Sequence, residues 1–201
     1  MRENRDRTLL TWIAPISTAL ALLVIPPSLA RGQKEAVATR QVPASHVLYT
    51  VYRGPYKEAG EAVKTLRRLA ASQGLKLRDD TVVWVLLNSE LKSPEDLLTE
   101  VRVAVEGGAV DKSRLQKEAG NLGLGTTGLK EVREAQVMQT TKAKGVADPS
   151  RLYERLYARI QSAGYRPAGL PENVFAEASR IPDSAEFQDL EVAIRIPVAK
   201  R

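Results

Sequence analysis

"VYRGPYKEAGEAVKTLRRLAASQG", residues 51–74, contains the end of a strand, a tight corner and a complete helix in one stretch. Gly54 permits the turn that leaves the strand, and Pro55 restricts the backbone at the entry to the helix. Gly74 favours an end of the helix at that point. Between the corner and Gly74, small and apolar residues recur at helical spacing: Ala59, Ala62, Val63, Leu66, Leu69 and Ala70. The stretch therefore predicts a strand followed by an amphipathic helix.

Two further strands are predicted after this helix. "TVVWVLLN" (81–88) is a nearly continuous apolar run, typical of a buried strand. "TEVRVAV" (99–105) alternates, with its valines on one face and Glu100 and Arg102 on the other. A helical start is expected between them at "SPEDLL", where Ser93 is suited to the cap. The first half of the chain is thus a strand–helix–strand–strand unit.

The same order of elements recurs in the second half. A polar, Gly-rich stretch at 106–128 is followed by strand-like, helical and again strand-like segments: "KEVREAQVMQTT", "SRLYERLYARIQSAG", "ENVFAEA" and "LEVAIRIPV". Gly54 and Gly74 are 20 residues apart, and Gly145 and Gly164 are 19 apart. Matching elements in matching order at nearly equal distances predict a duplication.

Two copies of this unit predict an α+β fold, with a mostly antiparallel sheet and two main helices on one face. The two halves are expected at about 45–105 and 129–201, and together they form a domain at 45–201. The polar, aperiodic residues 31–44 are predicted to be a linker.

The N-terminus has the composition of an export signal. Three arginines precede an apolar run at 8–25, and small residues follow at Ser28 and Ala30. One interpretation is a signal peptide that is cleaved after Ala30; the other is an uncleaved membrane anchor in residues 1–30, because the run is about long enough to cross a bilayer. Both interpretations predict an exported domain, periplasmic, secreted or tethered.

The overall composition excludes several function classes. The chain has no cysteine, which excludes disulfides, thiol catalysis and cysteine metal sites. The net charge of +6 is modest and dispersed, so no nucleic-acid partner is expected. His46 is the single histidine, and we expect it on the surface rather than at a metal or haem. No cofactor and no metal site are predicted.

Several short motifs resemble the GyrI-like small-molecule-binding domain, found in bacterial transcription regulators and in stand-alone proteins. They are "VYRGPY", "SQGL", "SPEDLLTEVRVAV" and a second half that runs "LYERLYARIQSAGYRPAG…IPV". The resemblance covers about 45–201 and implies two halves that enclose a cleft, which in relatives often holds a cationic or aromatic molecule against a glutamate. Some relatives are thought to be hydrolases and others membrane-anchored adaptors.

One position departs from the pattern of the family. Glu100 keeps the acidic residue in the first half, whereas Ala193 stands where the second half usually has a glutamate. The departure puts the usual cation site in doubt, but not the fold.

The candidate ligand-binding residues lie around the sheet face that the helices leave free. Glu100 and Glu191 are expected to supply carboxylates, and four aromatic residues an apolar wall: Tyr52, Tyr56, Trp84 and Phe175. Two other interpretations stay open. The charged residues would form cross-strand ion pairs on a wet face with Arg102 and Arg195, and Trp84 would belong to the core.

The function predicted from these residues is non-catalytic binding of a small molecule. One alternative is an adaptor that binds a protein partner with the same fold. The other is a hydrolase that uses Glu100 with help from Tyr52, because no cysteine nucleophile and no G-x-S-x-G motif are present. The membrane is an expected partner only through an uncleaved N-terminal segment.

Overall fold

The computed structural model describes residues 37–55, 58–88, 93–106, 110–140, 150–175 and 191–201. The predicted signal or anchor at 1–30 lies outside these residues, as do Tyr56 and Gly145. In the first half the elements are β1 (Val37–Val42), β2 (Ser45–Arg53), α1 (Ala59–Ser72), β3 (Leu77–Leu86), a 3-10 turn (Pro94–Asp96), β4 (Leu98–Val105) and α2 (Lys112–Asn121). In the second half they are β5 (Thr127–Val132), β6 (Ala135–Thr140), α3 (Ser150–Ser162), β7 (Tyr165–Pro167), β8 (Glu172–Phe175) and β9 (Val192–Lys200).

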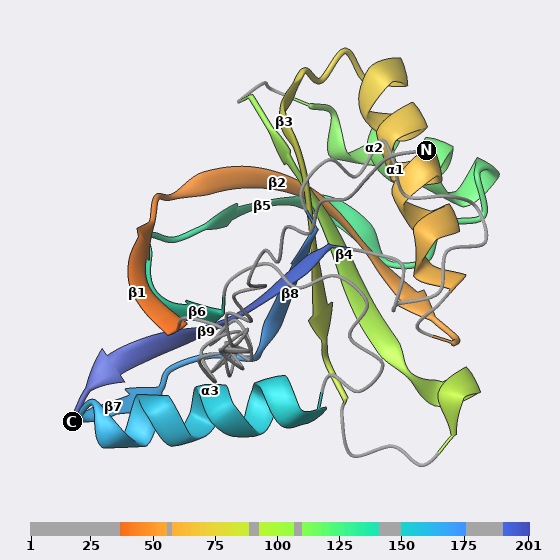
Figure 1. Ribbon diagram of the computed structural model, residues 1–201. Coiled ribbons are helices and arrows are strands. Elements are labelled where there is room, and N and C mark those ends of the chain that lie inside the picture. The colour runs from red at the N-terminus through yellow and green to blue at the C-terminus, as the bar shows by residue number, and fades with distance from the viewer. Residues whose placement is uncertain (1–36, 56–57, 89–92, 107–109, 141–149, 176–190) are drawn as a thin grey trace, which may run out of the picture. The chain divides into compact units, whose positions relative to one another are not determined.

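The strands form one curved sheet in the order β1-β6-β9-β8-β3-β4-β2-β5, with β7 paired to β9 (Figure 1). Every strand pair among the described residues is antiparallel. The predicted α+β class is therefore confirmed.

The strand order has the symmetry expected of a duplication. Exchanging β1 with β5, β2 with β6, β3 with β8 and β4 with β9 leaves the order unchanged. The two halves meet where β3 pairs with β8, with Trp84 opposite Asn173 and Val83 opposite Val174. This seam lies at the centre of the sheet.

The structure corrects the sequence-based boundaries in three places. Residues 37–42, assigned to a linker, form β1 and pair with β6. The polar stretch between the halves contains α2, whose Asp111 side chain caps the first turn by accepting from the backbone N–H of Ser113. These residues were missed because β1 is short and mostly exposed, and because α2 has only two buried apolar residues. β7 was not predicted either.

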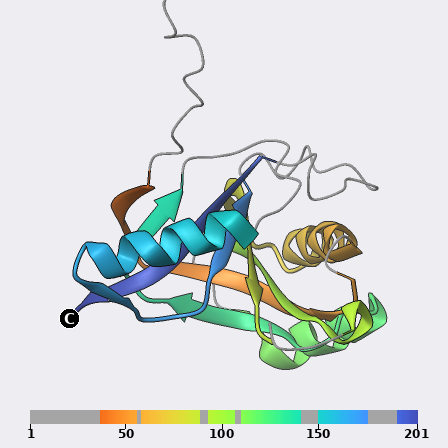
Figure 2. The same ribbon diagram turned by 60° about the horizontal axis from the view of Figure 1, so that its bottom comes forward.

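The core lies between the sheet and the helices, in two clusters. α1 packs on β2, β3 and β4 with Leu66 and Leu69 fully buried, and each such side chain contributes about 2 kcal/mol. α3 packs on β6 and β9 through Leu156 and Ile160. Figure 2 shows α1 and α3 on the same side of the strands, as the register requires, because both helices contact residues of the same face.

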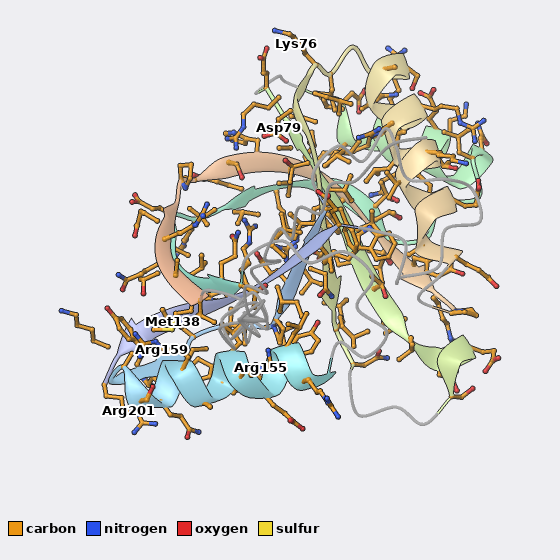
Figure 3. All side chains as sticks on the ribbon, viewed as in Figure 1. Lys76, Asp79, Met138, Arg155, Arg159 and Arg201 are labelled. Carbon is orange, nitrogen blue, oxygen red and sulfur yellow. The ribbon has the colours of Figure 1, made fainter. Side chains whose placement is uncertain are left out.

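The outer side of α3 is basic. In Figure 3, Arg155 and Arg159 extend along the helix, whereas Met138 of β6 is buried in the α3 cluster. Apolar residues at helical spacing on one side of the helix, with polar residues on the other, are the pattern that predicts this helix. No helix among the described residues is long and apolar enough to span a bilayer.

Candidate ligand-binding site

The face of the sheet opposite the helices carries a row of alternating apolar and charged residues. Residues that pair directly across strands point to the same face. One such row crosses five strands: Val51, Glu100, Val85, Glu172 and Arg195. The adjacent row contains Tyr49, Arg102, Val83, Val174 and Ala193. The helix-free face therefore brings together charges from both halves.

Five charged side chains on this face form what we call the charged cluster: Glu100, Arg102, Lys130, Glu172 and Arg195. Arg102 donates through Nε to Glu100, and through Nη1 to Oε1 of Glu172 at 2.9 Å. Arg195 donates through Nε to Oε2 of Glu172 at 2.5 Å. Glu172 therefore bridges one arginine from each half across the seam.

Lys130 completes the cluster from β5. Its Nζ donates to both carboxylate oxygens of Glu100, at 2.6 and 2.7 Å. The same ammonium lies 4.6 Å from the ring centroid of Tyr49, a cation–π distance. Gly128 lies opposite Tyr49 in close contact, because a Cβ there would lie 3.1 Å from the tyrosine hydroxyl and the ring would have to shift slightly.

Four of these charges are buried rather than on a wet face, and Lys130 is partly buried. The exposed fraction of the side chain is 8% for Glu100, 10% for Glu172 and 14% for each arginine, and it reaches 35% for Lys130. Burial alone would raise the pKa of Glu100, but the hydrogen bonds from Lys130 and Arg102 outweigh it and hold that pKa below its usual value. Glu100 is therefore ionised at neutral pH.

The charges of the cluster do not cancel. Two carboxylates face three cations, which leaves a formal charge of +1. The carboxylate oxygens are all engaged by donors within the cluster. Each carboxylate oxygen of the cluster thus has at least one donor among the described residues.

Tyr52, predicted to line the site, lies on the opposite face. It belongs to the set packed against the α1 core, and its hydroxyl donates to Glu58 at 3.0 Å. Burial, together with this bond to a carboxylate, raises the pKa of Tyr52 to about 12. Gly54 has a φ of 143°, and a Cβ there would lie 2.5 Å from the tyrosine hydroxyl. The corner in the first half is thus built around Tyr52.

Trp84 and Phe175 also lie on the helix-covered face. Both are buried, and their ring centroids are 4.5 Å apart across the β3–β8 seam. Glu191 is exposed and immediately precedes β9. The site thus gathers Glu100 from the predicted set, while Tyr52, Trp84, Phe175 and Glu191 lie elsewhere. Tyr56 lies outside the described residues.

Glu172 and Lys130 were not identified from the sequence. In "ENVF" the alternation places Glu172 and Val174 on one face and Asn173 and Phe175 on the other, a signal that would have identified Glu172. Nothing local marks Lys130, because its role depends on the pairing of β5 with β2. Glu100 and Arg102 do form an ion pair, but within β4 and buried rather than across strands on a wet face.

Metal binding has no support in the described part of the chain, where no three His, Asp or Glu side chains converge in a way that would hold an ion.

Comparison with known proteins shows the fold. No family model matches the chain, and no curated protein matches its sequence. The crystal structure of the EcmrR C-terminal domain is 16% identical, with 84% of this chain and 99% of that chain covered and a TM-score of 0.57. A hydrolase from Listeria innocua is 14% identical, with coverage of 83% and 93% and a TM-score of 0.58.

EcmrR in its complex with DNA is also similar, at 14% identity and a TM-score of 0.58 over 83% of this chain. This chain spans 58% of the length of that EcmrR chain. Identities this low show the fold alone. The resemblance to the GyrI-like domain is confirmed as a likeness of fold.

Proposed function

We propose that the domain binds a small organic molecule on the helix-free face of the sheet, at the charged cluster, without converting it chemically. The observation that carries the proposal is a group of five charged side chains, four of them buried and Lys130 partly buried, beside apolar ones on the face that no described helix covers. Binding sites for small molecules have this composition, with mostly apolar walls and a few fixed polar groups.

The energetics support a binding role over a purely structural one. Apolar residues in place of a buried ion-pair network are often equally stabilising, so the network itself is weak evidence for a contribution to stability. Val83, Val85 and Val174 lie beside the charges in the same rows. Apolar side chains at the charged positions would therefore also suit this face. This favours a role for the charges in recognition rather than in stability.

The arrangement argues against the hydrolase alternative. Glu100 accepts from Lys130 and Arg102, and its lowered pKa makes it a weak base. Tyr52, the proposed helper, lies on the other face and donates to Glu58. The carboxylate and the phenol that the alternative requires are therefore not brought together.

A thermal-shift screen tests the proposal. Aromatic and aliphatic compounds of negative, zero and positive charge are added to the full chain, and a ligand raises the melting temperature by mass action. We expect a hit to shift amide NMR signals of β3, β8 and β9, and to weaken in Arg195→Gln but not in Arg133→Gln, which removes an exposed arginine from the turn between β5 and β6. Absence of any hit would overturn the proposal and favour the adaptor that binds a protein partner.

We also propose that the domain is exported. Arg2, Arg5 and Arg7, the apolar run at 8–25 and the small residues at 28 and 30 support this proposal. Mass spectrometry of the protein from its native host tests it. A mature N-terminus at Arg31 indicates cleavage, retention in the membrane fraction indicates an anchor, and an intact soluble chain inside the cell would contradict export.

A further inference from the structure

The two halves place different residues at matching positions of the site. β4 and β9 exchange under the pseudo-symmetry of the sheet, so that Arg102 matches Arg195 and Glu100 matches Ala193. The duplication therefore keeps the arginine twice and the carboxylate once.

Lys130, the second cation that contacts Glu100, also has a counterpart in the pseudo-symmetry. Lys130 of β5 lies opposite Val47 of β2, and Arg40 of β1 lies opposite Val137 of β6. Because β1 exchanges with β5 and β2 with β6, Arg40 takes the place in the second half that Lys130 takes in the first. The pseudo-symmetry thus gives Arg195 and Arg40 the strand positions relative to Ala193 that Arg102 and Lys130 have relative to Glu100.

In the first half the carboxylate of Glu100 satisfies both cations, by hydrogen bonds from Arg102 and Lys130. In the second half Ala193 supplies no carboxylate. Arg195 turns its Nε to Glu172, and its terminal nitrogens donate to no other described residue. Arg40 is exposed on β1.

We propose that the ligand of this site is a small organic carboxylate, whose anionic group binds the terminal nitrogens of Arg195 and the side chain of Arg40. The bound carboxylate does for the second half what Glu100 does for the first. This inference rests on the proposed function and names the class of molecule that the site takes.

The chemistry of the donors favours this class. A guanidinium presents parallel N–H groups that match the two oxygens of a carboxylate, and Glu172 holds the Arg195 side chain in place through Nε. With Arg40 added, the site carries a formal charge of +2, which disfavours an organic cation. Val174 and Pro197 are neighbours of Ala193 and Arg195 for an apolar body.

Three probes with one aromatic body and different charge test the class of ligand: phenylacetate, phenylacetamide and phenethylammonium. Their affinities for the full chain are measured by calorimetry at one fixed ionic strength. We expect phenylacetate to bind at least about tenfold more tightly than the amide, because a hydrogen bond to an ionised group is roughly twice as strong as a neutral one. Phenethylammonium is expected to bind most weakly.

Variants test the residues. Arg195→Gln is expected to weaken phenylacetate binding about tenfold or more and to leave binding of the amide nearly unchanged. Arg40→Gln, at an exposed position with no cost to the core, is expected to weaken it a few-fold. Arg133→Gln is the matched control, because it removes one exposed positive charge from the turn between β5 and β6, outside the site.

The outcomes separate this inference from the proposed function. Equal or tighter binding of the amide or the ammonium ion overturns the carboxylate inference and leaves small-molecule binding intact. Phenylacetate binding that responds equally to Arg40→Gln and Arg133→Gln also overturns it, because it reflects net charge alone. If no probe and no compound of the wider screen binds, the proposed function fails, and this inference fails with it.

Discussion

The two halves of the domain share a scaffold and differ in their charges. On the helix-covered face, Val101 and Val103 of β4 correspond to Ile194 and Ile196 of β9, and all four are buried. On the other face, Glu100 corresponds to Ala193. The four apolar residues pack against the helices, whereas the exchange of glutamate for alanine changes the charge of the other face. These positions of β4 and β9 are therefore alike on the helix-covered face and different on the face of the proposed site.

The largest loss of stability is expected from a substitution at the seam between the halves. Phe175→Ala removes a buried ring that packs on Trp84, and we expect a loss of about 4 kcal/mol in the free energy of unfolding. Urea denaturation at neutral pH measures it. Val174→Ala, on the same strand but the free face, is the control and should cost clearly less. Similar losses in the two variants would contradict the distinction between the faces.

Glu172→Gln tests the charged bridge between the halves. It leaves the Arg102 and Arg195 guanidinium groups without their shared buried carboxylate, and we expect a loss of about 3 kcal/mol. Glu191→Gln, an exposed glutamate before β9, should stay within about 0.5 kcal/mol of the parent protein. Denaturation midpoints of both variants are compared. A Glu172 variant as stable as the control would contradict a stabilising role for the bridge.

Glu100→Gln tests the first half alone, and its effect depends on pH. The folded state holds the pKa of Glu100 below its usual value. The ionised carboxylate therefore stabilises the fold above the unfolded-state pKa of about 4.3, and this stabilisation is lost as the pH falls through the folded-state pKa.

We expect a loss of about 2 kcal/mol at pH 7 for Glu100→Gln, which narrows toward pH 3. Urea titrations of the variant and the parent protein at several pH values give the difference. A difference that is constant between pH 7 and pH 3 would show that the charge of Glu100 does not stabilise the fold.

The smallest effect is expected at Tyr52, whose corner is described only in the first half. Its pKa of about 12 exceeds the usual value of 10, so the folded state favours the neutral phenol. This preference costs stability as the pH rises from 10 toward 12. Tyr52→Phe should cost under about 1 kcal/mol at pH 7 and should lose less stability than the parent protein above pH 10. Parallel alkaline loss in both proteins would contradict the assignment.

Most of the fold, but only one residue of the candidate site, could be predicted from the sequence. Alternation in "TEVRVAV" and helical spacing in residues 59–70 reflect burial directly, so they predict the faces of β4 and α1 well. Trp84 and Phe175 show the limit of such patterns, because an apolar side chain looks the same whether it lines a binding site or fills a core. Their role was decided by which face of the sheet the helices cover.

The rest of the site depends on strand order. Lys130 reaches Glu100 only because β5 pairs with β2, and Glu172 meets Arg102 only because β8 pairs with β3. These contacts join residues 30 and 70 positions apart. Periodicity within a short window carries no information about such partners.

The strand order has a consequence for how the chain folds. β1 opens the first half but pairs with β6 of the second, and β5 opens the second half but pairs with β2 of the first. Each half therefore supplies an edge strand that pairs with a strand of the other half. Neither half has its full set of strand partners until the other is in place, so we expect the domain to fold in one cooperative step. Long-range pairing of this kind also makes folding slow compared with a helical protein of similar size.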